Sequence, residues 1–351
     1  MSENIFKSAL NHSNEGRPPV WFMRQAGRYH SHYQRLRAAN SFIDLCKKPE
    51  LACEVTFGPL DDFGFDAGIL FSDILFPLEA MGMGLNFEEG PKLDFQLRER
   101  ADVARLKGGV ALAGHLDFQA QALRLIRARL PADKGLIGFV GAPLTLYYYA
   151  VEGSHQNLDR SVKRSAHEGL RDGRFDSFCV KLLDLLAQNM ALQARAGADC
   201  VALFDTCAGE LTPAEYRATA VPALQAVLER FAQLCPGVPV VYYSKNTGAR
   251  HWAELRGLPI ACLGIDWNHD LPTVLREWSG EFAIQGNIDP NWLFLEPADL
   301  EARLRQVFAS VLALPADIRR AWVCGLGHGV LPKTPEHNVR LFLRIQKEMF
   351  S

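Results

Sequence analysis

Short apolar and β-branched runs alternate along this chain with longer segments in which apolar residues recur at helical spacing. Segments 49–64 and 297–313 are clear examples of the helical pattern. Such alternation predicts strands that take turns with helices, and it is typical of a parallel sheet with helical crossovers. The eight candidate strands are 20–24, 67–72, 136–141, 199–205, 238–243, 261–266, 282–286 and 321–326.

Eight alternating strands favour a (β/α)8 TIM barrel of the α/β class over an open doubly wound sheet. An open nucleotide-binding sheet usually carries a glycine-rich phosphate turn after its first strand, and this chain has none there. A GxGxG run does occur, at 325–329, but it lies at the last predicted strand. We therefore expect one barrel domain across residues 1–351, with the polar segment 1–16 as a mobile N-terminal extension.

The composition fits a soluble enzyme with a sizeable core. The 351 residues are 48% hydrophobic and 22% charged, close to ordinary globular usage. The 38 Lys and Arg residues against 40 Asp and Glu give a net charge of −2, which argues against binding to nucleic acid. No secretory signal is visible and no apolar run reaches membrane-spanning length, so we expect a cytoplasmic protein with no membrane partner.

The cysteines and one polar stretch add two further expectations. Eight cysteines are scattered without CxxC pairs, several of them inside apolar runs. They indicate buried free thiols in a reducing compartment rather than disulfides. The polar stretch around 152–175 predicts a long loop.

Polar side chains follow most of the predicted strands at the point where each strand ends. In barrel enzymes the active site is built at the carboxyl ends of the strands, so these residues are candidates for one shared site. One such residue would mean little, because every strand must end in something polar, but a full rim of them is informative. They are Arg24, Arg28, Asp73, Asp205, Thr206, Lys245, Asp266, Gln285, Asn287 and His328.

The first of these strand ends opens a strongly cationic segment. Between Gly16 and Ile43 there is no Asp or Glu, while five arginines and two histidines occur there. Arginine binds carboxylates through two parallel hydrogen bonds, so the segment suits a polyanionic substrate. The alternative is a solvated basic loop whose partners lie elsewhere.

Asp73 ends an apolar strand with a single carboxylate. An acid in such a place must be hydrogen-bonded or paired if it is buried. It can serve as a helix cap or as the partner of an arginine. In a pocket, however, the same carboxylate can accept several converging N–H donors.

Recognisable sequence blocks occur from one end of the chain to the other: PPVWFMRQAGRY (18–29), PELACEVT (49–56), FGFDAGILFSDIL (63–75), GAPLTLYYYAVEG (141–153), LFDTCAG (203–209), LGIDW (263–267), QGNIDP (285–290) and GLGHGVLPKTPEHNV (325–339). Taken together, over about residues 5–348, these blocks resemble the uroporphyrinogen decarboxylase family. The resemblance implies a single barrel, usually a homodimer, that acts in porphyrin and heme biosynthesis. It also implies that the four acetate side chains of uroporphyrinogen III become methyl groups, giving coproporphyrinogen III and carbon dioxide, without cofactor or metal.

The resemblance also implies roles for residues. A pyrrole ring protonated next to its acetate group becomes the electron sink, and Asp73 would accept the pyrrole N–H groups and stabilise the positive charge. Arg28, Tyr149 and His328 join Asp73 as the expected catalytic residues. The expected substrate-binding residues are Arg24, Gln25, Ala26, Gly27, Arg28, Asp73, Tyr149, Thr206 and His328.

Several of these residues also have plain structural explanations. Tyr149 belongs to a run of three tyrosines that packing alone can explain, and Thr206 can be a helix cap. Lys245 can form a Schiff base, or it can pair with a carboxylate. His328 lies between Gly327 and Gly329, and glycines on both sides indicate a close approach of backbone to a ligand.

The chain departs from the family pattern in a few places, which leaves room for altered substrate handling at 30–32 and 152–160. These places are His30-Ser31-His32, Asp61-Asp62, Cys207, Gly325 and the loop after Gly153.

Two alternatives to a decarboxylase therefore stay open. One is a zinc-dependent corrinoid or thiol methyltransferase of the same superfamily, for which Cys324 and His328 have CxxxH spacing and Cys207 and Cys262 lie near strand ends. The other is a non-catalytic tetrapyrrole-binding protein.

Overall fold

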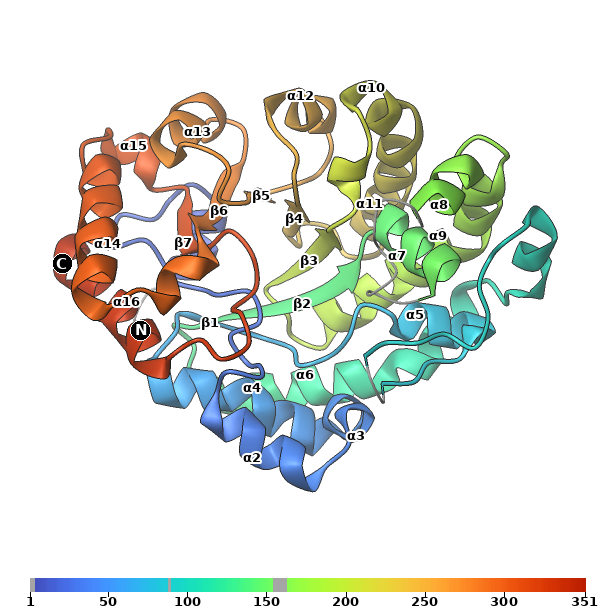
Figure 1. Ribbon diagram of the computed structural model, residues 1–351, viewed down its shortest axis with the longest axis horizontal. Helices are drawn as coiled ribbons and strands as arrows, with labels where there is room; N and C mark the ends of the chain where they lie inside the picture. The colour runs from blue at the N-terminus through green and yellow to red at the C-terminus, as the bar shows by residue number, and fades with distance from the viewer. Residues whose placement is uncertain (1–3, 88–89, 154–162) are drawn as a thin grey trace.

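A computed structural model describes residues 4–87, 90–153 and 163–351. Within these ranges, seven parallel strands form one curved sheet in which every strand pairs with its neighbours in chain order, β1-β2-β3-β4-β5-β6-β7. Helices surround this sheet on its outer side (Figure 1). The predicted TIM-barrel class and the parallel sheet with helical crossovers are confirmed.

The strands fall where the apolar runs predicted them, with ends shifted by a few residues. β2 and β3 pair from Ile137 opposite Cys200 to Gly141 opposite Phe204. β6 and β7 pair from Ile284 opposite Trp322 to Ile288 opposite Leu326. The strands are β1 Ala67–Ile69, β2 Gly135–Gly141, β3 Cys200–Asp205, β4 Val240–Ser244, β5 Cys262–Gly264, β6 Ala283–Ile288 and β7 Trp322–Leu326.

The first predicted strand, 20–24, is not a regular strand, but it occupies the eighth position of the barrel. Val20 forms an isolated parallel bridge with Cys324 of β7. The Cys324 amide donates to the Pro19 carbonyl at 2.8 Å, and the Trp21 amide donates to the Cys324 carbonyl at 3.1 Å. On the other side, the amide of Asp66, just before β1, donates to the Val20 carbonyl at 3.0 Å. Residues 19–21 therefore join the two edges of the sheet.

The outer layer consists of helices that mostly match the predicted amphipathic segments. Neighbouring helices pack in pairs, among them α4 with α6, α9 with α11 and α14 with α16. The α-helices are α1 Ile5–Leu10, α2 Ser31–Ala39, α3 Phe42–Lys47, α4 Pro49–Phe63, α5 Phe76–Leu78, α6 Asp117–Arg129, α7 Pro143–Glu152, α8 Lys163–Gly169, α9 Arg174–Arg195, α10 Pro213–Glu215, α11 Val221–Leu234, α12 Ala249–Trp252, α13 Leu271–Trp278, α14 Pro297–Leu312, α15 Ala316–Arg319 and α16 Glu336–Phe350. Shorter 3-10 and π segments are η1 Glu79–Met83, η2 Arg100–Arg105, η3 Val110–Leu116, η5 Ala208–Glu210, η6 Tyr216–Ala220, η7 Ala253–Leu255 and η8 Pro290–Phe294.

The N-terminal segment, expected to be mobile, contains the ordered helix α1. Its Phe6 and Leu10 are buried and line a small gap in the barrel interior together with Trp21 and Gln285. The cause is local packing, since Phe6 lies so close to Gly135 that a Cβ added there would come 2.8 Å from the Phe6 Cγ. Helix α1 thus covers the end of the barrel where the strands begin.

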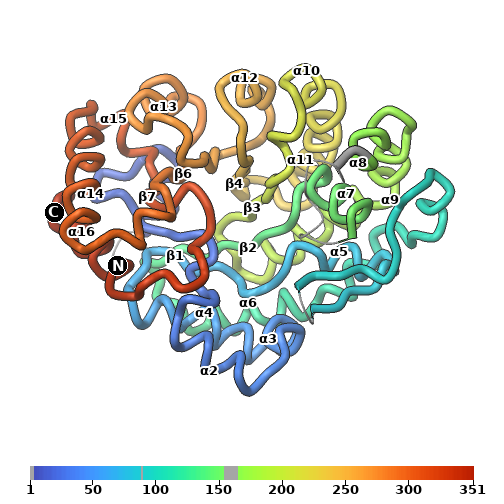
Figure 2. Tube along the Cα trace, viewed as in Figure 1, coloured from blue at the N-terminus to red at the C-terminus, as the bar shows by residue number. Residues whose placement is uncertain are grey.

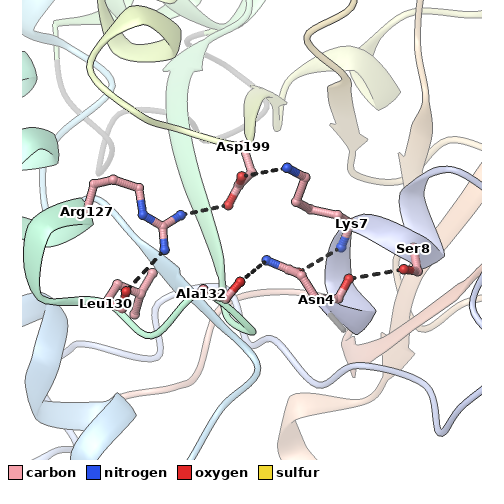
Figure 3. A pocket seen from close by; sticks show the side chains of 7 residues that line it. All are labelled: Asn4, Lys7, Ser8, Arg127, Leu130, Ala132 and Asp199. Atoms are coloured by element: carbon pink, nitrogen blue, oxygen red, sulfur yellow. Dashed lines mark hydrogen bonds and ion pairs between the residues drawn. The ribbon is translucent and has the colours of Figure 1, made fainter. Parts of the chain in front are cut away.

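Ion pairs hold α1 in this place, beside a shallow cavity of about 450 Å³ (Figure 3). Lys7 Nζ lies 3.3 Å from one oxygen of Asp199, which precedes β3, and Arg127 Nη1 lies 3.1 Å from the other. The Asn4 side chain reaches the Ala132 carbonyl at 3.4 Å. These polar groups bind one another, so the cavity is a seam between α1 and the barrel.

Three further expectations can be compared with the structure. All eight cysteines lie in the described residues and are buried and free, which confirms the predicted thiols. The stretch 152–175 is not one long loop, because α8 begins within it, and its residues 154–162 lie outside the described part of the chain. Within the described residues no helix has both the length and the apolar character needed to cross a bilayer.

Candidate active site

Asp73 lies four residues beyond β1, where the chain turns towards α5. Its Oδ1 accepts a hydrogen bond from the Leu75 amide at 2.9 Å, so the carboxylate fixes the turn before that helix. The side chain is only half-buried, yet the protein around it removes enough water to raise the pKa of Asp73 to about 6. The Leu75 hydrogen bond and the Arg24 charge oppose this rise. A carboxylate that is poorly solvated and still ionised at neutral pH can stabilise a nearby cation strongly.

Arg24 is the cation whose charge acts on this carboxylate. Its backbone adopts the left-handed conformation, with φ of 60°, which is uncommon for a residue with a side chain and is often found at functional sites. Arg24 is exposed, and its charge partly offsets the rise that burial causes in the pKa values of Asp73, Tyr149 and Tyr243. Arg24 therefore lies in the middle of the candidate site.

Tyr149 faces the same centre from α7. Burial is the main reason that its pKa is raised, with further contributions from Cys207 and Asp73. The phenol therefore stays neutral and can donate a hydrogen bond to a carboxylate. Its neighbour Tyr147 is fully buried and packs against Phe175 at a ring-centroid distance of 5.1 Å. Packing thus explains Tyr147, whereas Tyr149 is placed at the candidate site.

His328 follows β7 and lies between two aromatic rings. The Tyr243 ring stacks on it at a centroid distance of 5.9 Å, and the Trp267 ring at 6.3 Å with an interplanar angle of 15°. The Tyr243 hydroxyl donates to the Gly327 carbonyl at 2.9 Å. Tyr243 and Trp267 were missed as site residues, although each occurs at the end of a predicted strand.

Protein contacts account for the glycines on both sides of His328. A Cβ on Gly327 would lie 2.6 Å from the Trp267 amide nitrogen, and a Cβ on Gly329 would lie 2.8 Å from the Arg24 Cγ. Three loops therefore interlock around His328.

Thr206 is half-buried and is fixed from both sides by buried hydrogen bonds. Asp205 accepts hydrogen bonds from the Thr145 and Tyr242 hydroxyls, each at 2.7 Å. The Thr145 hydroxyl in turn accepts the Cys207 amide at 3.1 Å. Burial raises the pKa of Asp205 to about 6 despite these two donors. Asp205 is thus a structural residue that orients the loop carrying Thr206.

Other polar strand ends are also structural rather than exposed to a ligand. Asp266 accepts the Asn246 amide at 2.6 Å and the Asn268 amide at 3.0 Å. The Asn287 side chain donates to the carbonyls of Asp266 and His269 at 3.1 and 2.8 Å. Gln285 is buried and donates to the Leu326 carbonyl at 3.2 Å. Polar residues at strand ends thus overstate the size of the candidate site.

The expected substrate-binding residues 24–28 do not all face the same way. Gln25 is 1% exposed, and its side chain donates to the Ala67 carbonyl at 3.0 Å and accepts the Phe22 amide at 3.4 Å. Its side chain is therefore used by the fold, which leaves only its backbone for a ligand. Ala26 and Gly27 are half-exposed, and Arg28 is exposed and near enough to oppose the rise that burial causes in the pKa of Tyr33.

Residues 30–32, expected to alter substrate handling, anchor the arginine-bearing loop to the barrel. The fully buried His30 lies with Nε2 2.7 Å from Asp62 Oδ2 on α4. The Ser31 amide donates to Glu336 Oε1 on α16 at 2.7 Å. His30 and Asp62 are both departures from the family pattern, and the structure pairs them. The other expected place, 152–160, lies mostly outside the described residues.

The described residues contain no group of three or more His, Cys, Asp and Glu side chains arranged to hold a metal ion. Cys324 is fully buried, and the charges of Arg17 and Asp66 act on it. His328, by contrast, lies between Tyr243 and Trp267. The CxxxH spacing therefore does not create a pair of metal ligands.

Comparison with known proteins shows the family to which this chain belongs. The family model described as "Uroporphyrinogen decarboxylase (URO-D)" matches residues 1–349. A relative from Chloroflexus aggregans, named uroporphyrinogen decarboxylase, is 38% identical over 343 residues, which cover 95% of this chain and 92% of the relative. A relative of the same name from Pelobacter propionicus is 36% identical, and the match covers 93% of this chain and 93% of the relative. Another from Legionella pneumophila is 34% identical, and the match covers 99% of this chain and 97% of the relative.

Solved structures agree on the fold. A methyltransferase from Methanosarcina mazei superposes with a TM-score of 0.79 at 15% identity, with complete coverage of both chains. A B12-independent methionine synthase from Shewanella gives a TM-score of 0.51 at 11% identity over 95% of each chain. At these identities the likeness shows the architecture alone.

The fold and the site define a TIM-barrel enzyme in which the charge of an arginine acts on a poorly solvated carboxylate beyond the carboxyl ends of the strands. Within that class, the chain belongs to the uroporphyrinogen decarboxylase family.

Proposed function

We propose that this protein removes the four acetate carboxylates of uroporphyrinogen III, giving coproporphyrinogen III and carbon dioxide in porphyrin and heme biosynthesis. The observation that carries the proposal is that Asp73, Arg24 and Tyr149 lie close enough, beyond the carboxyl ends of the strands, to act on one another electrostatically. The substrate combines many carboxylates with pyrrole N–H groups, and this mouth offers groups that match both. Family membership supports the same reaction.

The proposed chemistry uses the substrate's own pyrrole ring. A proton adds to the ring carbon next to the one that bears the acetate group, and the ring becomes a cation with positive charge on the acetate-bearing carbon. The bond to the carboxylate then breaks, its electron pair moves into the ring, and carbon dioxide leaves. A second proton adds to the methylene carbon, the ring loses the first proton, and a methyl group remains.

Asp73 stabilises the cation in this scheme. Its carboxylate accepts the pyrrole N–H groups and is mostly ionised at neutral pH, above its raised pKa of about 6. Because few water molecules surround it, its interaction with the ring cation is strong.

The remaining residues bind and orient carboxylates. Arg24 and Arg28 supply guanidinium forks, while Tyr149, Thr206 and His328 supply hydrogen bonds. Among residues 25–27, only the backbone of Gln25 and the half-exposed Ala26 and Gly27 are available to the substrate. We propose further that the protein acts as a cytoplasmic homodimer.

An anaerobic assay with uroporphyrinogen III tests the proposal. The products are separated by carboxylate number, and the wild-type protein should yield species with seven to four carboxylates. Asp73→Asn should lower kcat by about a hundredfold or more, as expected when a preorganised charge is lost. Asp317→Asn, on the exposed face of α15, is the matched control and should keep full activity.

Other outcomes would favour the alternatives. Full activity in Asp73→Asn would contradict the mechanism. Binding without turnover in the wild-type protein would indicate a non-catalytic tetrapyrrole-binding protein. Zinc at one equivalent per chain, with methyl transfer, would indicate a methyltransferase.

A further inference from the structure

Lack of room for a side chain, and not an unusual backbone conformation, explains why position 329, next to His328, is a glycine. Glycines with a positive φ occur at eleven described positions, and Gly329 is not among them. A Cβ at this position would overlap the Arg24 Cδ and would lie 2.8 Å from its Cγ and 3.1 Å from its Nε. The Arg24 side chain therefore lies directly across the missing side chain of Gly329.

The backbone around both residues holds them in this relation. The Val330 amide donates to the Met23 carbonyl at 2.9 Å, which ties the loop after β7 to the loop that carries Arg24. The left-handed conformation of Arg24, with φ of 60°, sets where its side chain leaves the backbone. Because the backbones of both loops are fixed, the slot at Gly329 determines the path of the Arg24 side chain.

We propose that Gly329 is a positioning residue, whose missing side chain leaves the slot that directs the Arg24 guanidinium towards Asp73 and a carboxylate of the substrate. The part that concerns substrate rests on the proposed function. The part that concerns Arg24 and Asp73 rests on the structure alone and can be tested without any substrate.

The contact is one that a mutation can change without unfolding the protein. The atoms that a new Cβ would meet belong to a flexible, exposed side chain, so the arginine can move away. At Gly327 the same change would meet the backbone of residues 266 and 267, at 2.6 Å from the Trp267 nitrogen. Gly280 is exposed and has open space around it.

Three alanine variants separate positioning from packing. Gly329→Ala should keep a melting temperature near that of the wild type and should displace Arg24. Gly327→Ala should lower the melting temperature, because backbone cannot yield as a side chain can. Gly280→Ala should change neither stability nor activity.

The first readout is the titration of Asp73, followed by NMR in protein labelled with carbon-13 aspartate. The resonance is assigned by its absence in Asp73→Asn. Displacing Arg24 removes a charge that holds the pKa of Asp73 down, so Gly329→Ala should move the titration midpoint of Asp73 upward. In an Arg24→Ala background, Gly329→Ala should cause no further shift, because the two changes act through one contact.

The second readout is kinetic. Gly329→Ala should raise KM for uroporphyrinogen about tenfold, which corresponds to about 1.4 kcal/mol of lost binding, and should leave kcat much less affected. An unchanged Asp73 titration, or additive shifts in the double variant, would overturn the proposal. A loss of melting temperature as large as that of Gly327→Ala would also overturn it, by showing a packing role. If the titration shifts as expected but the wild-type protein decarboxylates nothing, the proposed function fails and the positioning of Arg24 stands.

Discussion

Single residues at this site combine poor solvation with a retained charge. Asp73 is the clearest case, because burial raises its pKa to about 6 while a backbone amide and Arg24 keep it ionised at neutral pH. In the folded state the acid thus binds a proton more readily than in the unfolded chain, where its pKa is near 3.8. Its contribution to stability is therefore fully present below pH 3.8 and is lost as the pH rises through 6.

We predict that Asp73→Asn removes activity and at the same time stabilises the fold at pH 7. The amide oxygen can still accept the Leu75 amide, and the poorly solvated charge is gone. The gain in the free energy of unfolding should be on the order of 1 kcal/mol, since partial exposure reduces the cost of the charge. Urea denaturation at pH 7 and at pH 4 measures it. A variant less stable than wild type at pH 7, or a gain as large at pH 4, would contradict this account.

His30 should make stability depend on pH in the opposite direction. Its ring is fully buried, Nδ1 has no hydrogen-bond partner among the described residues, and burial lowers its pKa below 6.5 despite the pairing with Asp62. A base with a lowered pKa in the folded state destabilises the fold as the pH falls from 6.5 towards that lowered value. His30→Gln keeps a donor for Asp62 and should lose part of this dependence. Melting curves of both proteins at about pH 5 to 8, on either side of the ordinary histidine pKa, test this prediction. Identical pH profiles of the two proteins would show that His30 is not responsible.

At the scale of elements, α1 is the part whose role the sequence did not reveal. Its length of six residues is too short for a stable isolated helix, and its polar surroundings favoured a mobile tail. Packing of Phe6 and Leu10 against the barrel stabilises it instead. The short helix therefore belongs to the core.

We predict that Phe6→Ala lowers the free energy of unfolding by about 3–5 kcal/mol, as expected when a buried aromatic side chain is removed. Phe6 is 1% exposed, whereas Phe294 in η8 is 46% exposed. Phe294→Ala is therefore the matched control and should cost less than about 1 kcal/mol. Urea denaturation compares the two variants. Equal losses would mean that α1 does not cover the barrel as described.

Patterns of several residues predicted the elements well where the pattern repeated over several turns. The segment 49–64 carries a proline start and an apolar helical face, and α4 spans Pro49–Phe63. The predicted strand 20–24 contains Val20, Trp21 and Phe22, which are apolar because they are buried, but only Val20 pairs as a strand. Burial and strand pairing give the same short apolar run, so the sequence could not separate them.

The candidate site was predicted in part for a related reason. Asp73, Arg24, Tyr149 and His328 come from blocks that resemble the family, and the first three act on one another electrostatically in the structure. Gln25 belongs to the same kind of block, yet its side chain serves the fold. Tyr243 and Trp267 were missed because aromatic residues at strand ends are usually interpreted as part of the hydrophobic core. Which way a side chain points depends on contacts with distant segments, and local patterns do not contain them.

At the scale of the whole molecule, one ion pair helps to close the barrel. Arg17 contacts both oxygens of Asp66, with Nη1 to Oδ2 at 2.7 Å, and Asp66 also accepts the Val20 amide at 2.7 Å. Asp66 precedes β1, and residues 19–21 pair with β7, so the carboxylate ties together the two edges of the sheet. Figure 2 shows the first and last parts of the chain side by side here.

We predict that Asp66→Asn lowers the free energy of unfolding by about 2–3 kcal/mol. One charged partner of a largely buried pair is lost, and Arg17 keeps some contact with water, which limits the cost. Asp117→Asn removes an exposed carboxylate that lies 3.9 Å from Arg124, and this control should cost less than about 1 kcal/mol. Chemical denaturation of both variants in parallel measures the difference. A neutral Asp66→Asn would mean that the hydrogen-bonded backbone closes the barrel without the ion pair.

The position of residues 19–21 also affects how the protein can be made. During synthesis residues 19–21 leave the ribosome before any strand of the sheet, whereas their partner Cys324 follows only after β6. Until then the growing sheet keeps two unpaired edges, which are prone to join other chains. A protein chain truncated before residue 324 should therefore aggregate rather than form a smaller folded product.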